Sequence, residues 1–383
     1  MIDQIHIENL RVFAKADIML SDFTVLVGPN GVGKSTALLA LDLLGRAVSS
    51  GGGDILTDRM HPEVLRTRGS KDGIVLEAAG KVEEGKDWRL RFETPGADPA
   101  SPPRSRGNVI RWKAPAQEGW KSLPNALEEG GSPANVFPLV QSLRLAEDQL
   151  WRPADIEGDE EPVLHANGDN LAAVLAFLNL NKPDTFERIQ DALRCVVPGV
   201  TRLRFRPARL EKLEWTERPL FTAPTGAAPE LSRKVVSGFE LLFDMKVGDG
   251  IPAHSVSEGT LRSLGLFTAF LASRRPALVL LDDLERAIHP RALTELIQQI
   301  RGFQRQISGL QVLATTHSPY LLDEFDPTEV RLLWSDERGL STCEPMVENP
   351  DYPKWCEIMS AGELWSVLDP PRRASPRPAR GQE

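Results

Sequence analysis

Cysteine is scarce in this chain of 383 residues, and the three that occur are Cys195, Cys343 and Cys356. They form no CxxC pair and no even-numbered set, so the sequence excludes a disulfide framework and a cysteine-rich zinc module. We expect three small, buried, apolar side chains in a reducing compartment. The His and Cys residues also form no cluster with the spacing of a metal site.

Long hydrophobic runs are missing as well. No stretch approaches the ~18 apolar residues that a transmembrane helix needs, so we expect no membrane span. The opening segment carries Asp3 and Glu8, where a signal peptide has a basic and then an apolar stretch. We therefore expect a cytoplasmic protein. The net charge of −9 argues against nonspecific coating of nucleic acid or of an anionic membrane, although it leaves a local basic patch open.

The composition that remains is that of a globular protein, because 41% of the residues are hydrophobic and 26% are charged. The length suits two domains or one large domain with insertions. The 30 prolines exceed the usual share of roughly 5%, and they gather in residues 95–138 and 370–378. Because the segment 369–383 is rich in Pro and Arg and has almost no apolar residue, we expect a disordered tail there.

Apolar patterning predicts an α/β fold at both ends of the chain. Residues 23–27 form a continuous β-rich apolar run, which is typical of a strand buried on both faces, and a helical pattern follows over 35–47. The middle of the chain carries short β-like runs, two helices at 171–180 (with Asn170 as N-cap) and 184–196, and strands at 200–206 and 239–247. The α/β pattern resumes with a helix at 258–273, a strand at 277–281, a helix at 290–301, a strand at 310–315 and a helix at 318–325.

The strongest motif follows the strand 23–27 and satisfies GxxxxGK[ST]. It consists of Gly28, Pro29, Asn30, Gly31, Val32, Gly33, Lys34, Ser35 and Thr36. The glycines let backbone N–H groups approach phosphates closely. Lys34 is placed for the β- and γ-phosphates, Ser35 for Mg²⁺, and the helix that begins near Lys34 directs its N-terminus at the anion.

Two acidic residues end the apolar strand 277–281. Asp282 is expected to hold Mg²⁺ through its water shell, and Asp283 to orient and deprotonate the attacking water. On their own, two such acids are as often a helix cap and turn. The phosphate loop elsewhere in the chain favours the functional interpretation.

Two further segments fit a nucleotide site. His317, after the strand 310–315, can reach a γ-phosphate, although a histidine in a loop before a helix is also ordinary. Ser257, Glu258 and Gly259 open a helix, which makes either an anion site or an ordinary cap. Since the molecule already has one complete phosphate loop, this second helix start suggests contact with nucleotide on another subunit.

Together these segments resemble the ABC-type ATPases, which include the SMC, RecF and OLD groups. The resemblance rests on IHIENLRVF (5–13), GPNGVGKST (28–36), SEGTLR (257–262), LLDDLERAIHP (280–290) and TTHSPYLLD (315–323). HANGDNLAAVLAFL (165–178) and AGELW (361–365) are further similar to small bacterial predicted ATPases of the AAA family.

The resemblance implies an α/β P-loop NTPase with a mixed core sheet flanked by helices and an inserted β-rich and helical lobe. It implies ATP and Mg²⁺ as ligands and a head-to-tail homodimer that sandwiches two ATP molecules. Ser257 and Gly259 then reach the nucleotide held by the partner's phosphate loop, and His289 lies at the dimer seam. Gln141 is a weak candidate for the Q-loop. Because loop and carboxylates belong to one site, we expect a single split domain, with halves at 1–48 and 241–368 around a lobe at 49–240.

One departure from the family pattern concerns the residue after the metal-binding Asp, which is usually Glu and is Asp283 here. Loss of one methylene withdraws the carboxylate by roughly 1.5 Å, and a misplacement near 1 Å costs about 100-fold in rate. We therefore expect slow hydrolysis, with ATP acting as a long-lived switch. Glu285 is a candidate to compensate for the shorter carboxylate of Asp283.

The biological role stays open at this stage. By resemblance, we expect an anti-phage defence ATPase that acts with a separate effector, because too few residues follow the strand near 329–334 for a nuclease domain. The alternatives are a RecF-like DNA-repair protein, a transporter subunit and a non-hydrolysing scaffold. Arg202, Arg204 and Arg206 share one strand face and could grip DNA, or form an ordinary solvated face. Trp112 could stack on a base or lie in a sheet.

Overall fold

The computed structural model describes residues 1–50, 61–81, 87–96, 109–113, 119–122, 137–156, 161–215, 231–272 and 277–368. These residues form two compact units. The first contains the described residues of Met1–Ser142, Ala277–Glu285 and Ile307–Glu383, and the second those of Leu143–Pro276 and Arg286–Gln306. The split-domain boundaries expected from the sequence stay a prediction, and the expected tail at 369–383 lies outside the described residues.

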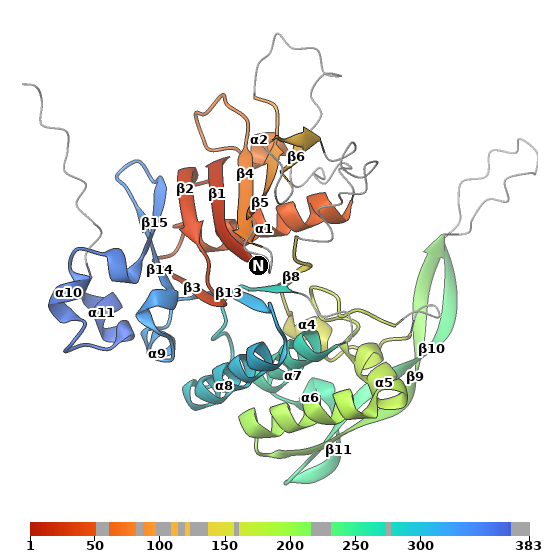
Figure 1. Cartoon of the computed structure of the whole chain (residues 1–383). Coiled ribbons are helices and arrows are strands. Elements are labelled where there is room, and N and C mark those ends of the chain that lie inside the picture. The colour runs from red at the N-terminus through yellow and green to blue at the C-terminus, as the bar shows by residue number, and fades with distance from the viewer. Residues whose placement is uncertain are drawn as a thin grey trace, which may run out of the picture. The chain divides into compact units, whose positions relative to one another are not determined.

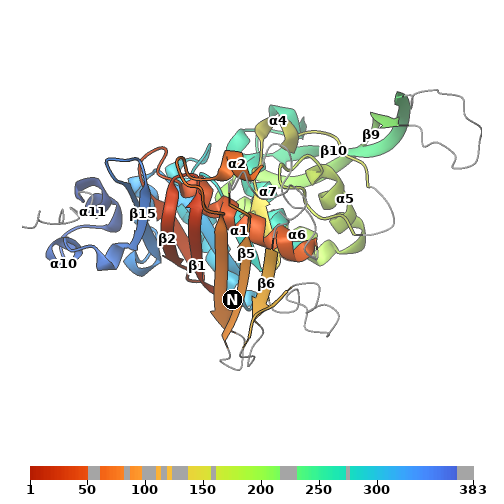
Figure 2. The same ribbon diagram turned by 90° about the horizontal axis from the view of Figure 1, so that it is seen from above.

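One sheet of the first unit is antiparallel, in the order β2-β1-β4-β5-β6-β7 (Figures 1 and 2). Its strands are β1 (Ile2–Leu10), β2 (Phe13–Met19), β4 (Val75–Lys81), β5 (Asp87–Glu93), β6 (Val109–Lys113) and β7 (Lys121–Ser122). Side chains on β4, β5 and β6 alternate between buried and more exposed positions, as expected for a sheet with one face on the core. Trp88 and Trp112 lie on the buried face with ring centroids 5.9 Å apart.

The second sheet of this unit is mixed, in the order β15-β14-β3-β13-β12-β8. Its strands are β3 (Phe23–Val27), β8 (Val140–Leu143), β12 (Leu278–Leu281), β13 (Gln311–Thr316), β14 (Val330–Ser335) and β15 (Ser341–Pro345). The ladder from β14 through β3 and β13 to β12 is parallel, whereas β15 is antiparallel to β14. Every residue of β3, β12 and β13 is buried, as expected for strands that are covered on both faces.

Helix α1 (Lys34–Ser49) packs on both sheets. It contacts β1, β4 and β5 of the antiparallel sheet and β12 and β13 of the mixed sheet. Small and aliphatic side chains from Ala37 to Ala47 fill the resulting core. The remaining helical segments of this unit are short and comprise α2 (Pro62–Leu65), α9 (Pro319–Leu322), η5 (Pro327–Glu329), η6 (Met346–Glu348), α10 (Tyr352–Trp355) and α11 (Ala361–Val367).

The second unit combines helices with a three-stranded sheet in the order β11-β10-β9 (Figure 1). Its elements are α4 (Glu147–Leu150), α5 (Leu171–Asn181), α6 (Pro183–Val196), β9 (Val200–Trp215), β10 (Leu231–Met245), β11 (Gly248–Pro252), η4 (Ala253–Ser255), α7 (Glu258–Leu271) and α8 (Pro290–Gln306). Helix α7 is almost wholly buried and packs on α4, α5, α6 and α8. Phe303 of α8 lies against Phe267 and Phe270 of α7.

The α/β class expected from the sequence is confirmed, with local differences. The helix predicted over 318–325 is only the four residues of α9, and a turn follows it at 323–324. The strands predicted at 200–206 and 239–247 belong to the longer strands β9 and β10. The prediction of three buried cysteines is wrong for two of them, since Cys195 and Cys356 are exposed and Cys343 is half-buried. None of the described helices is both long and apolar enough to cross a membrane.

Candidate functional site

The phosphate-loop motif lies between β3 and α1, as predicted. Gly33 precedes the helix with a φ of 95°, and a Cβ there would lie 2.6 Å from Val12 Cγ2. A Cβ on Gly28 would lie 2.6 Å from the Leu333 carbonyl oxygen. Both positions therefore require glycine. Among the described residues, no side chain caps the start of α1, so the N-terminus of the helix keeps donors for an anion.

Lys34 is buried at the start of α1 and turns back onto its own loop. Its Nζ donates to the carbonyl oxygens of Gly28 at 2.8 Å and Pro29 at 3.0 Å, and it lies 3.4 Å from His317 Nδ1. Burial lowers the pKa of Lys34 below its usual range, and the negative charges of nearby carboxylates partly offset this. An anion in the loop would offer Lys34 a stronger partner than these neutral carbonyls.

Asp282 follows β12 and receives two hydroxyl groups. Ser35 Oγ of α1 donates to Asp282 Oδ1 at 3.0 Å, and Thr315 Oγ1 of β13 donates to the same oxygen at 2.7 Å. The predicted pair of metal-site residues, Ser35 and Asp282, is thus in direct contact. Thr315 is fully buried, and the sequence reasoning gave it no role. It lies one step beyond the last paired residues of the adjacent parallel strands, Leu281 and Ala314, a position that the sequence alone does not reveal.

The residues after Asp282 are bonded to the residues after β13. The Asp283 N–H donates to Thr315 Oγ1 at 2.9 Å, and the Leu284 N–H donates to the Thr315 carbonyl at 3.1 Å. Glu285 Oε1 accepts from the His317 N–H at 2.7 Å, and His317 Nε2 lies 3.9 Å from Asp283 Oδ1. Asp283 has a φ of 52°, in the left-handed region. Lys34, Ser35, Asp282, Asp283 and His317 therefore meet at the carboxyl ends of β3, β12 and β13.

This arrangement can bind a phosphorylated ligand and a hard cation. The loop and helix start supply N–H donors and one ammonium group, and the adjacent hydroxyl and carboxylate of Ser35 and Asp282 supply the oxygen ligands that Mg²⁺ prefers. Among the described residues there is no group of three or more His, Cys, Asp or Glu side chains that could hold a metal alone. A cation here therefore needs water or ligand oxygens to complete its shell.

The predicted signature segment belongs to the second unit. Ser257 is the N-cap of α7, and its Oγ accepts from the Thr260 N–H at 3.3 Å. Gly259 packs against the following chain segment, because a Cβ there would lie 2.3 Å from the Ala287 carbonyl oxygen. Glu258 pairs with Arg286 at 3.4 Å. His289 is exposed before α8, and its Nδ1 accepts from the Arg291 N–H at 3.3 Å. The roles of these residues across a dimer stay predictions.

The predicted basic face of β9 is largely neutralised. Arg202, Arg204 and Arg206 do lie on one exposed face, but Arg204 pairs with Asp244 and Arg206 with Glu240 across the ladder to β10. This pairing matches the interpretation as an ordinary solvated face.

The two remaining candidate residues lie in the sheets of the first unit. Trp112 is 1% exposed, so the stacking interpretation is wrong and the sheet interpretation is confirmed. Gln141 lies on β8, beside β12, and its Q-loop role stays a prediction.

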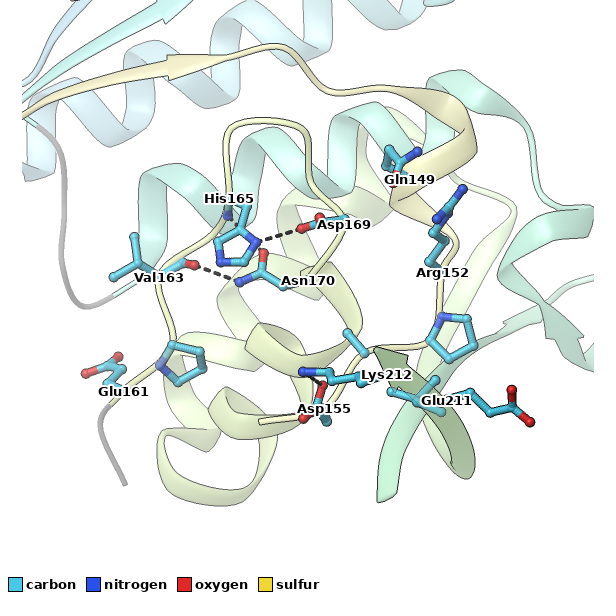
Figure 3. A pocket seen from close by; sticks show the side chains of 14 residues that line it. Gln149, Arg152, Asp155, Glu161, Val163, His165, Asp169, Asn170, Glu211 and Lys212 are labelled. Carbon is cyan, nitrogen blue, oxygen red and sulfur yellow. Dashed lines mark hydrogen bonds and ion pairs between the residues drawn. The ribbon is translucent and has the colours of Figure 1, made fainter. Parts of the chain in front are cut away.

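The second unit also contains a cavity of about 530 Å³ between residues 149–155 and 161–170 on one side and β9 on the other (Figure 3). Its charged groups are paired: His165 Nδ1 lies 2.7 Å from Asp169 Oδ1, and Lys212 Nζ lies 2.7 Å from Asp155 Oδ1. Asn170 is at the N-cap position of α5 as predicted, but its side chain links the Val163 carbonyl and the His165 N–H and makes no capping bond to the helix. None of the nucleotide-site residues predicted from the sequence lines this cavity.

A glycine-rich loop between a buried parallel strand and a helix, with an acidic residue after another parallel strand of the same sheet, defines a P-loop nucleoside triphosphatase. Residues 139–323 match the family model described as "AAA domain, putative AbiEii toxin, Type IV TA system", and residues 1–61 match the model described as "AAA ATPase domain". No curated protein matches the chain in sequence.

A solved SMC head domain shares this fold. An SMC head bound to the C-terminal winged-helix domain of ScpA is 15% identical with a TM-score of 0.54, over 90% of this chain and 96% of that chain. The SMC head domain of Thermotoga maritima is 12% identical with a TM-score of 0.49, over 90% and 98%. The two matched models are both AAA ATPase domains, and the fold is that of an SMC-like P-loop head domain.

Proposed function

We propose that the protein binds ATP with Mg²⁺ at the loop Gly28–Thr36 and hydrolyses it slowly. The contact of Ser35 Oγ with Asp282 Oδ1 at 3.0 Å, beside the buried ammonium of Lys34, is the observation that carries the proposal. It brings the hydroxyl of the phosphate-loop helix and the carboxylate of a separate strand together, as a Mg²⁺ site beside phosphates requires.

The residues of the chain then have separate tasks. The loop amides and Lys34 hold the phosphates, and Ser35 and Asp282 hold Mg²⁺. Asp283 orients the attacking water, and His317 detects the γ-phosphate. When bound, Mg²⁺ neutralises the charge that develops on the transferred phosphoryl group. Hydrolysis is slow because the Asp283 carboxylate stops roughly 1.5 Å short of the reach of a Glu.

A homodimer closes around two nucleotides in this proposal. Ser257 and Gly259 of one protomer reach the nucleotide held by the other, with the N-terminus of α7 directed at its phosphates. The N-cap position of Ser257 and the close packing of Gly259 support a rigid helix start. ATP therefore acts as a switch between monomer and dimer.

The test combines turnover with assembly. Purified protein should release phosphate from ATP in a Mg²⁺-dependent way, and Lys34→Ala should abolish binding of a fluorescent ATP analogue. Lys15→Ala is the matched control, because Lys15 is a lysine of the same unit with 68% of its side chain exposed. Light scattering should give a dimer for Asp283→Asn with ATP and a monomer without it. Unchanged turnover in Lys34→Ala would contradict the nucleotide site, and a monomer under all conditions would contradict the switch.

The switch acts in bacterial anti-phage defence, through a separate effector protein. The description of the matched family as a putative toxin of a type IV toxin–antitoxin system supports this setting. Cells that express the protein with the products of its neighbouring genes should plate phage with lower efficiency, and Lys34→Ala should restore plating. Equal plating with and without the wild-type protein would contradict the defence role and leave the ATPase proposal standing.

A further inference from the structure

The carboxylate of Glu285 lies beside the candidate nucleotide site, and its two oxygens have different surroundings. Oε1 accepts from the backbone N–H of His317 at 2.7 Å. Oε2 is buried, and among the described residues it meets no hydrogen-bond donor. A buried carboxylate oxygen without a hydrogen-bond partner costs free energy, so this side chain lowers the stability of the folded protein. The bond that it does make is to the main chain of the histidine that faces Lys34.

The path of the chain explains why Glu285 reaches this position. Asp283, with its φ of 52°, turns the chain back after β12. The N–H groups of Asp283 and Leu284 then donate to Thr315. The next residue, Glu285, also contacts this chain segment, but its side chain accepts a hydrogen bond, whereas Asp283 and Leu284 donate from their backbone N–H groups. The segment after β12 is thus fixed along the end of β13, and the Glu285 bond extends these contacts to the main chain of His317.

The imidazole of His317 lies between groups of opposite charge. Its Nδ1 is 3.4 Å from Lys34 Nζ and its Nε2 is 3.9 Å from Asp283 Oδ1. About 40% of the side chain is exposed, so packing alone does not fix the ring. The orientation of the main chain at residue 317 therefore controls where the ring stands relative to Lys34.

We propose that Glu285 is a positioning residue, which holds the His317 main chain so that the imidazole stays beside Lys34 and the γ-phosphate position. This inference rests on the proposed ATPase function of the same site. Glu285 does not act as the base that activates water, because one of its oxygens is bonded to His317 and the other is closed to solvent. The two roles differ in what they need: positioning needs an acceptor oxygen, whereas a base needs the negative charge.

Two variants separate these roles. Glu285→Gln keeps an acceptor for the His317 N–H and removes the charge, whereas Glu285→Ala removes both. Glu337→Ala is the matched control, because Glu337 is an exposed acidic residue of the same unit. If Glu285→Ala does not fold, Glu285→Asp replaces it, because its carboxylate is withdrawn by roughly 1.5 Å.

The first measurement needs no nucleotide. Backbone amide hydrogen exchange at His317 should be at least about 10-fold faster in Glu285→Ala, because the N–H loses its acceptor. It should stay near the wild-type rate in Glu285→Gln and Glu337→Ala. Unchanged exchange in Glu285→Ala would overturn the inference without touching the ATPase proposal, which Lys34→Ala tests separately.

The second measurement is steady-state hydrolysis. Glu285→Ala should lower kcat by about 10- to 100-fold, in line with the cost of a misplaced catalytic group, and leave KM nearly unchanged because the phosphate loop is intact. Glu285→Gln should restore most of kcat. If Glu285→Gln is as slow as Glu285→Ala while the His317 amide stays protected, Glu285 acts through its charge and the positioning role is wrong.

Discussion

The hydroxyl of Thr315 donates to the carboxylate of Asp282 at 2.7 Å, and the oxygen of that hydroxyl, Thr315 Oγ1, accepts from the Asp283 N–H at 2.9 Å. One buried side chain of β13 thus fixes both acids that follow β12. Ser35 adds a second hydroxyl to Asp282 from α1. The candidate metal ligand therefore has its orientation set by two elements before any cation arrives, which lowers the cost of ordering it on binding.

Replacing Thr315 with Val keeps the shape of the side chain and removes its hydroxyl. Asp282 then loses a donor and the Asp283 N–H loses its acceptor, which should cost about 1–3 kcal/mol of unfolding free energy. The loosened carboxylates should slow hydrolysis by about 10- to 100-fold, while ATP binding persists through Lys34. Urea unfolding and phosphate release check the two effects. Thr315→Ser is the control that should restore both, and wild-type turnover in Thr315→Val would refute the role.

The two left-handed glycines of the phosphate loop predict unequal costs for added methyl groups. Gly33→Ala places a Cβ 2.6 Å from Val12 Cγ2 at a φ of 95°, whereas Gly31→Ala at a φ of 81° meets nothing within 4 Å. Both should lose about 1–2 kcal/mol from the backbone conformation, and Gly33→Ala should lose more because of the contact. Urea unfolding without nucleotide measures the difference. Equal losses would show that the loop accommodates the contact freely.

The surroundings of Asp244 predict that the stability of the second unit depends on pH. Burial alone would raise the pKa of Asp244, but the hydrogen bond from the Gly250 N–H at 2.8 Å and the pairing with Arg204 lower the pKa below its usual 3.8. A carboxyl whose pKa falls on folding stabilises the fold above its unfolded-state pKa. That contribution is lost as the pH falls through the lowered value.

The matching experiment compares wild type with Asp244→Asn. The wild type should be more stable to urea at neutral pH, and the gap should narrow as the pH falls below about 4. Asp249→Asn is the control, since Asp249 is exposed on the neighbouring strand β11. A gap that stays constant down to pH 2 would mean that the charge of Asp244 contributes nothing.

The core of the fold could be predicted from the sequence because its signals are local. The β-rich run from Phe23 to Val27, which is apolar except for Thr24 and is followed by the glycine loop, predicts a doubly buried strand, and the structure has that strand at the centre of the mixed sheet. The apolar strand before Asp282 carries the same signal, and the strand before His317 carries a weaker one because Gln311, Thr315 and Thr316 are polar. Because carboxyl ends of parallel strands meet at one edge, their motifs also predicted the cluster of site residues.

The features that the sequence could not predict depend on contacts between residues that are far apart along the chain. The pairing of β4 with β1 joins residues near 75 to the first strand, and short alternating runs give no partner. Thr315 and Glu285 have clear positions only once β12 and β13 are side by side. The prediction for Cys195 was wrong because it relied on the usual burial of cysteine, whereas this residue lies on the exposed face of α6. The arginine face of β9 likewise gave no hint of its pairing with β10.

The shorter acid at position 283 leads to the last prediction. A φ of 52° is tolerated better by Asp than by Glu, so the backbone here favours the residue that the family pattern does not. Asp283→Glu should extend the carboxylate by roughly 1.5 Å and raise kcat by about 10- to 100-fold. It should also lower the unfolding free energy, by up to about 1–2 kcal/mol.

Single-turnover phosphate release and urea unfolding of the same preparations measure these opposite effects. Asp283→Asn is the control, because Asn tolerates the same backbone and carries no charge, so it should lose turnover and keep stability. If Asp283→Glu loses stability without gaining rate, the reach of this side chain does not limit hydrolysis. If Asp283→Glu gains rate, the length of the side chain at residue 283 limits hydrolysis. The left-handed backbone at this residue then favours the shorter Asp, and with it the lower rate of ATP hydrolysis.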